Sequence, residues 1–193
     1  YLFDRSAKVY TCPLAMTDGC ARTLEVMAEP ALRDRVVTRL ASRDAERAWI
    51  SGQWMTERAG GSDVGHLRTT AVRDGDHYVV NGAKTFITSA VRGDYVVAAV
   101  RTGGQGAAGI SMLVIERGTP GFEVSRKLAK MGWRSSDTAE LSFTDARVPA
   151  ENLIGAEHTG FAQIAMGFVS ERIGLAVQAY SSAQRCLDLT VAW

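Results

Sequence analysis

The stretch Ser51-Gly-Gln-Trp-Met-Thr-Glu-Arg-Ala-Gly-Gly-Ser-Asp-Val64 decides the interpretation of this sequence. It begins as a strand and runs into a glycine-rich turn that carries Thr56, Ser62 and Asp63. Two adjacent glycines let the backbone approach a ligand closely, and exposed amides and hydroxyls can bond to polar ring or phosphate atoms. An ordinary turn capped by Ser and Asp would also explain this stretch, so its neighbours must decide.

Two further segments support a ligand-binding interpretation. In Asn81-Gly-Ala-Lys-Thr-Phe-Ile-Thr88, strand alternation places Phe86 and Thr88 on one face, where an aromatic surface beside a hydroxyl suits a planar ring. The alternative is a half-buried strand whose aromatic side chain packs into the core. A third segment, Met131-Gly-Trp-Arg-Ser-Ser-Asp-Thr138, leads into Leu-Ser-Phe-Thr-Asp-Ala-Arg-Val-Pro-Ala-Glu-Asn-Leu-Ile-Gly155. Three such segments in one order favour the ligand.

The sequence around these segments predicts an α+β fold in the order helix, sheet, helix. Residues 11–40 are rich in Ala, Leu, Met, Glu and Arg, and Pro30 stands where a second helix can begin. Short β-branched and aromatic runs broken by Gly, Asp and Asn predict an antiparallel sheet over residues 49–148. Residues 161–193 have the pattern of one long helix.

The clearest predicted hairpin spans residues 69–80, because Asp74-Gly75 is a dipeptide that tight turns favour. Further strands are expected at residues 84–88, 95–101, 110–116 and 141–148.

Composition limits the classes of function. The 193 residues are 46% hydrophobic with a formal net charge of +1, which indicates a globular, soluble chain without the basic field of a nucleic-acid-binding protein. Cys12, Cys20 and Cys186 form neither a disulfide framework nor a zinc motif. No membrane span or leader is visible, so we expect a cytoplasmic protein. The chain lacks an initiating Met and ends within a helical pattern, so we expect it to be a piece of a longer subunit.

Three apparent motifs are rejected. Residues 104–109 match Gly-x-Gly-x-x-Gly, but a strand rather than a helix is predicted next, so a dinucleotide loop is excluded. Ser62, Asp63 and His66 are the residue types of a hydrolase triad, yet such triads need no sequence proximity, and we interpret these as loop residues. His66, His77 and His158 lack partners at ligand spacing, so no metal is predicted.

The three segments, taken together, resemble the acyl-CoA dehydrogenase family, whose Thr-Glu-x-x-x-Gly-Ser-Asp, Asn-Gly-x-Lys-x-x-Ile-Thr and Val-Pro-x-x-Asn-Leu-x-Gly motifs occur in this order. The start of the chain is also similar to the alkylation-response branch of that family. The resemblance implies part of an N-terminal helical domain (residues 1–48), a middle β-barrel-like domain that binds flavin and acyl-CoA (49–157), and the first helix of a C-terminal bundle (158–193).

The resemblance also implies FAD as cofactor and assigns residues to it by motif position. Thr56 and Thr88 would hydrogen-bond the flavin ring, and Ser62 would also meet the coenzyme A end of the substrate. Phe86 stands where the family commonly has Trp, while Gln53, Trp54 and Arg58 depart from the common pattern. The expected flavin-binding set is Gln53, Trp54, Met55, Thr56, Gly61, Ser62, Phe86, Ile87 and Thr88.

A candidate general base lies in the long helix. Residues 161–180 are apolar on almost every face, which predicts a buried helix, and Glu171 shares a stripe with Phe168 and Leu175. A desolvated carboxylate suits a base working near neutral pH, although a structural ion pair involving Glu171 and Arg172 is the alternative. Resemblance to the long-chain and isovaleryl branches, which have Glu-Arg here, implies that Glu171 is the base and Arg172 a substrate-pocket residue; most other members have the base farther along the chain.

The implied activity is dehydrogenation of an acyl-CoA to a trans-2-enoyl-CoA, with electrons passed to an electron-transferring flavoprotein by a homodimer or homotetramer. The alternatives are an acyl-CoA oxidase, a flavin-containing DNA-associated alkylation-stress protein, and a non-catalytic relative. The sequence does not assign the acyl chain length.

Overall fold

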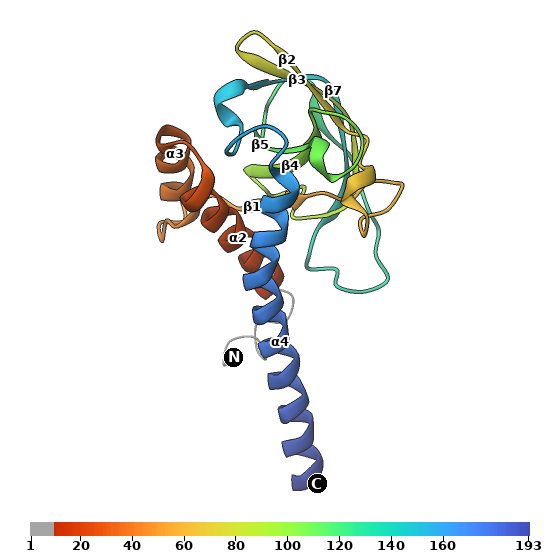
Figure 1. The fold of residues 1–193 in the computed structure, drawn as a ribbon. Coiled ribbons are helices and arrows are strands. Elements are labelled where there is room, and N and C mark those ends of the chain that lie inside the picture. The colour runs from red at the N-terminus through yellow and green to blue at the C-terminus, as the bar shows by residue number, and fades with distance from the viewer. Residues whose placement is uncertain (1–9) are drawn as a thin grey trace.

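The computed structural model describes residues 10–193, so residues 1–9 of the predicted N-terminal domain lie outside the described part. Two short helices, α2 (Thr11–Met27) and α3 (Pro30–Leu40), precede a seven-stranded sheet, and the long helix α4 (Gly160–Ala192) follows it. Figure 1 shows α2 and α4 crossing beside the sheet, with α4 extending well away from it. The predicted α+β fold is confirmed.

The two N-terminal helices separate where the sequence predicts it. Pro30 occupies the first turn of α3, where its missing amide costs no hydrogen bond. Ala28 is extended between the helices. Each helix buries one face, α2 through Cys20 and Leu24 and α3 through Leu32, Val36 and Leu40.

The sheet is largely antiparallel, with strand order β1-β4-β2-β3-β7-β6 and β5 paired to β4. Its first strand, β1, instead joins β4 in parallel, and β2 has one parallel pair with the end of β4. The predicted hairpin is confirmed, with Gly75 at φ 60° in its turn. The strands are β1 (Ser51–Trp54), β2 (Thr70–Asp74), β3 (His77–Thr88), β4 (Tyr95–Arg101), β5 (Ile110–Glu116), β6 (Phe122–Lys127) and β7 (Thr138–Pro149).

Strands β4 and β5 are buried on both faces, which explains their nearly unbroken apolar sequences. In β4, Ala98 and Val100 belong to a core within the curved sheet, while Val97 and Ala99 belong to a second core beneath the helices. Ile164 of α4 joins this second core. The first turns of α4 are thereby fixed against the sheet.

The remainder of α4 is not buried in the described structure, so the prediction of a buried helix is wrong here. Only its first part packs on α2 and the sheet, and large apolar side chains beyond that part remain exposed. No described helix combines the length and apolar character that crossing a membrane requires. The exposed residues include Val169, Ile173, Leu175, Val177, Tyr180, Leu187, Leu189 and Val191.

Candidate functional site

The glycine-rich turn after β1 is anchored by a buried carboxylate. Glu57 is only 6% exposed, and its Oε1 lies 2.8 Å from Nζ of Lys84 on β3. The same oxygen accepts hydrogen bonds from the amide and hydroxyl of Thr69, at 3.0 and 2.6 Å. Oε2 accepts from the amide of Arg68 at 2.6 Å. Both carboxylate oxygens are therefore occupied by protein donors.

Burial and pairing act in opposite directions on this ion pair. Burial favours a higher pKa for Glu57, but the charge of Lys84 and the surrounding hydrogen bonds outweigh it and lower the pKa below 4.5. Burial lowers the pKa of Lys84, and Glu57 opposes that shift. The pair holds the turn against β3, where the Thr85 amide also donates to the Thr56 carbonyl at 3.0 Å. The sequence motifs contain both charged residues, but sequence reasoning assigned neither a role.

This anchoring leaves the tip of the turn open. Gly60, Gly61 and Ser62 are exposed, and a side chain added at Gly60 would meet nothing within 4 Å. A side chain at Gly61 would instead come within 2.8 Å of the Thr56 hydroxyl. The backbone of the turn can thus be approached closely, as expected for a ligand-binding loop.

Phe86 projects from β3 at a break in the strand ladder. The β3–β7 register shifts between Lys84 and Ile87, and Phe86 has φ 55° with 68% of its surface exposed. A positive φ is uncommon for a bulky residue, and such strain concentrates at functional sites. Ile87 points into the core and Thr88 is half-buried. The structure therefore places an exposed aromatic ring two residues from a half-buried hydroxyl-bearing residue.

The structure sorts the predicted flavin-binding residues by accessibility. Trp54 is 1% exposed and packs on Phe122 and Phe143, with ring centroids 5.2 and 6.4 Å away. Its side chain and that of Ile87 are therefore core components, and only their backbones can meet a ligand. Gly61, Ser62 and Phe86 are exposed, and Gln53, Met55, Thr56 and Thr88 are partly exposed.

The candidate base lies at a second cluster, where three elements converge. Gln53 of β1 donates a hydrogen bond from Nε2 to Oε1 of Glu171 on α4, at 2.5 Å. Gly19 of α2 faces this pair, and a Cβ there would lie 2.9 Å from each of the two bonded atoms. Glu171 is partly buried, whereas Arg172 is exposed, with its guanidinium 5.7 Å from the centre of the Phe168 ring.

A groove of about 780 Å³ runs between α2 and α4, and Glu171 lies on its wall. Its α2 side carries Cys12, Asp18 and Arg22, and Trp133 reaches it from the β6–β7 connection. Burial, and to a smaller extent the charge of Glu171, raises the pKa of the Cys12 thiol.

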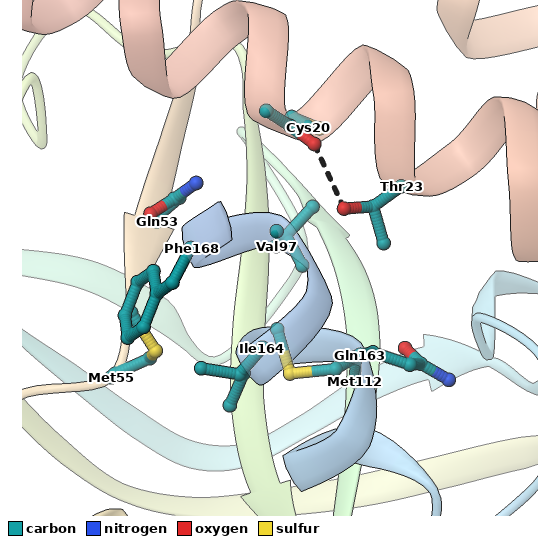
Figure 2. A pocket seen from close by; sticks show the side chains of 11 residues that line it. Cys20, Thr23, Gln53, Met55, Val97, Met112, Gln163, Ile164 and Phe168 are labelled. Atoms are coloured by element: carbon teal, nitrogen blue, oxygen red, sulfur yellow. Dashed lines mark hydrogen bonds between the residues drawn. The ribbon is translucent and has the colours of Figure 1, made fainter. Parts of the chain in front are cut away.

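A small cavity of about 30 Å³ lies beneath this groove. Figure 2 shows it between Gln53 and Phe168 on one side and Thr23 and Gln163 on the other. Gly19 and Gly167 line both spaces, so the groove leads from solvent toward Gln53.

The rejected dinucleotide motif folds as a loop between two strands. Only a single turn, Ala107–Gly109, precedes β5, and Arg101 donates to the carbonyls of Gly65 and Gly106. The prediction that a strand follows this motif is confirmed. Across residues 10–193, no three His, Cys, Asp or Glu side chains gather in a way that could hold a metal ion.

Comparison with known proteins identifies the family of this arrangement. Residues 52–146, which carry the glycine-rich turn and most of the sheet, match the acyl-CoA dehydrogenase middle domain. The chain belongs to the acyl-CoA dehydrogenase family. It is 41% identical over 179 residues to the cyclohex-1-ene-1-carbonyl-CoA dehydrogenase of Geobacter metallireducens, covering 92% of this chain and 46% of that dehydrogenase.

Solved structures with similar folds agree. A putative acyl-CoA dehydrogenase from Mycobacterium smegmatis is 58% identical, with a TM-score of 0.79, covering 97% of this chain and 47% of that one. The structure of PigA in complex with FAD is 28% identical, with a TM-score of 0.75, covering 81% and 40% of the two chains. The chain thus spans about half the length of the acyl-CoA dehydrogenases it matches.

Proposed function

We propose that this chain supplies the flavin-binding domain and the catalytic base of an FAD-dependent acyl-CoA dehydrogenase. The observation that carries the proposal is the position of Glu171. This residue lines the groove between α2 and α4, and its carboxylate accepts a hydrogen bond from Gln53. In this proposal, residues 49–157 form the middle domain, and α4 is the first helix of a C-terminal bundle.

The residues around the glycine-rich turn suit a flavin. The exposed face of Phe86 can stack on a planar ring, and the hydroxyls of Thr56 and Thr88 can bond to its polar edge. The absence of side chains at Gly60 and Gly61 lets a ligand come close to the backbone of the turn. FAD, when bound, would accept the hydride that leaves the β-carbon of the acyl group. The related PigA structure contains FAD, which supports this cofactor.

Glu171 would act on the substrate as a general base. The α-carbon of an acyl thioester carries a weakly acidic proton, and a carboxylate on the groove wall can accept it. The groove would hold the acyl chain between α2 and α4, next to Glu171. Ser62 would contact the coenzyme A end, and the exposed Arg172 would contribute positive charge near the substrate pocket.

The finer points of the activity rest on the family. A relative acts on a cyclic acyl-CoA, as its name states, and the α2–α4 groove is large enough for a short or branched acyl group. Transfer of electrons to an electron-transferring flavoprotein, and assembly as a homodimer or homotetramer, belong to this proposal through the family resemblance. We also propose that the protein acts in the cytoplasm.

Anaerobic titration of the full-length, FAD-loaded protein with a panel of acyl-CoAs tests this function. Straight, branched and cyclic acyl groups should be included, and bleaching of the flavin absorbance by at least one of them is expected. Lack of bleaching by all of them would contradict the proposal. A parallel measurement of hydrogen peroxide formation in air separates a dehydrogenase from an oxidase.

Substitution of Phe86 by Ala tests the cofactor site separately. Loss of ring stacking should weaken FAD binding by roughly 0.5–1.5 kcal/mol, which is about a 2- to 13-fold rise in Kd. Val72→Ala, at an exposed apolar position on β2, is the matched control. Equal FAD affinity in both variants would contradict the placement of the flavin against Phe86.

A further inference from the structure

The side chain of Gln53 has a contact that flavin binding does not explain. Its amide is directed at Glu171, which lies 118 residues farther along the chain, and donates to one carboxylate oxygen. Among residues 10–193, no other residue donates a hydrogen bond to the Glu171 carboxylate, and the Gln53 amide bonds to its Oε1. Oε2 is left without a protein donor in the described part of the chain.

We propose that Gln53 is a positioning residue that fixes the orientation of Glu171 and leaves Oε2 as the oxygen that accepts the α-proton. This inference rests on the proposed function, because it assumes that Glu171 is the base. A glutamate side chain has three rotatable bonds, so an unrestrained carboxylate on a groove wall would sample several positions. A donor on the rigid strand β1 selects one of them before the substrate arrives.

The helix α2 approaches the hydrogen bond between Gln53 and Glu171 closely, at a position occupied by glycine. Gly19 lies in the middle of α2, where glycine is unfavourable for helix formation. A Cβ at this position would be 2.9 Å from both Nε2 of Gln53 and Oε1 of Glu171, too close for ordinary contact. The absence of a side chain on Gly19 therefore allows α2 to cover the hydrogen bond and shield it on that side.

The chemical nature of the donor also matters. An amide is neutral, so it orients the carboxylate without placing a compensating positive charge against it. The charged and titratable groups on the same groove wall are Cys12, Asp18 and Arg22 on α2, and Arg172 follows Glu171 on α4. None of these is hydrogen-bonded to Glu171 in the described structure, so the orientation of the base depends on Gln53.

The test compares Gln53→Met with wild type in the full-length, FAD-loaded protein. Met keeps nearly the same length and volume but cannot donate a hydrogen bond. Proton abstraction is measured as exchange of the α-hydrogens of a 3-thia-acyl-CoA with D2O by mass spectrometry. This analogue has sulfur in place of the β-carbon, so no hydride can leave and exchange reports the base alone. We expect exchange to slow by about 10- to 100-fold, the scale of a misplaced catalytic group.

Two further measurements separate positioning from a structural role. Dissociation constants for FAD and for the thia-analogue should change less than twofold, and the melting temperature should remain that of the control. Difference infrared spectra, with the Glu171 carboxylate band assigned by its loss in Glu171→Gln, should show that band displaced in Gln53→Met. Gln184→Met is the matched control, because it removes a glutamine-to-carboxylate hydrogen bond of 2.8 Å to Asp188 on the same helix.

The outcomes are distinct. Slow exchange with intact binding and a displaced band supports the proposal. Wild-type exchange in Gln53→Met overturns it, and so does a parallel loss of FAD affinity, which would make Gln53 a cofactor-binding residue. Wild-type exchange in Glu171→Gln would instead show that the base is elsewhere and would overturn the proposed function itself.

Discussion

Two glutamates in this chain, Glu57 and Glu171, have the same side chain in opposite surroundings. Glu57 is buried, paired with Lys84, and accepts hydrogen bonds at both oxygens. Glu171 borders an open groove, has one neutral donor, and keeps the other oxygen free in the described structure. A buried carboxylate whose two oxygens both accept hydrogen bonds from fixed donors can hold a loop, but a substrate cannot reach it. These surroundings support a structural role for Glu57 and the proposed catalytic role of Glu171.

The sharpest way to break this comparison is to neutralise Glu171. Glu171→Gln in the full-length protein should lower the rate of flavin reduction by acyl-CoA by about 10²- to 10⁴-fold, since a general base is lost. FAD content and melting temperature should be retained, because the site is not part of a core. Stopped-flow absorbance measures the rate, and Asp188→Asn, farther along α4, is the control. Unchanged reduction would place the base outside this chain.

Removing the partner of Glu57 should produce the reverse pattern. Lys84→Met leaves an unpaired buried charge, which should lower the free energy of unfolding by about 3–5 kcal/mol. Urea denaturation measures this loss. Arg147→Met, which breaks an exposed pair with Asp74, should cost only about 0–1 kcal/mol.

The double variant Glu57→Gln with Lys84→Met should recover part of that stability, because no unpaired charge then remains. If the single variant Lys84→Met lost no more free energy of unfolding than Arg147→Met, the structural role assigned to the buried pair would be contradicted.

Gly19→Ala sharpens the comparison at the catalytic side. The added methyl group would displace the flexible ends of Gln53 and Glu171, so proton abstraction should slow by about tenfold, which corresponds to about 1.4 kcal/mol. Helix propensity favours Ala over Gly by about 0.5–1 kcal/mol, so the melting temperature should not fall much. A slower rate together with a large loss of stability would show that the methyl group disrupts helix packing rather than the base.

The smallest expected effect is a loss of folding stability at acidic pH through Glu57. The pKa of Glu57 is lowered in the folded protein, so the unfolded state takes up its proton first as the pH falls. The stability contributed by this carboxylate is therefore complete well above pH 4.5 and is lost as the pH falls through 4.5 toward the lowered value. Urea titrations between pH 7 and pH 3.5 should show a steeper loss for wild type than for the double variant. Parallel curves would contradict the shift.

Local patterns predicted most of the fold. The bounds expected for β4 and β5 agree with the structure because both strands have nearly continuous apolar sequences. The strand β6 (Phe122–Lys127) was missed, since five of its six residues are exposed and several are charged, which resembles a loop. The burial of α4 was overestimated, because an apolar sequence shows that a helix needs partners but does not supply them.

The candidate site was predictable only in part. Strand alternation indicated Phe86, and the apolar stripe of the long helix indicated Glu171. The structure exposes the Phe86 side chain and places Glu171 on the wall of a groove. The Gln53–Glu171 hydrogen bond joins residues with no shared local pattern, so periodicity could not reveal it. One feature of the sequence could have indicated the role of Lys84: it is a single cation within a strand-like segment, and the neighbouring motif contains Glu57. Sequence spacing does not show, however, that the two side chains are buried and paired.

The distribution of Gly19, Gln53 and Glu171 along the chain has a consequence for biosynthesis. During translation, the strands β1 to β7 emerge from the ribosome before α4 does, so the sheet can begin to fold before Glu171 reaches it. The hydrogen bond across 118 residues then forms late, when α4 docks on an existing surface. A chain that ends before residue 171 would accordingly keep every strand of the sheet and lack the proposed base.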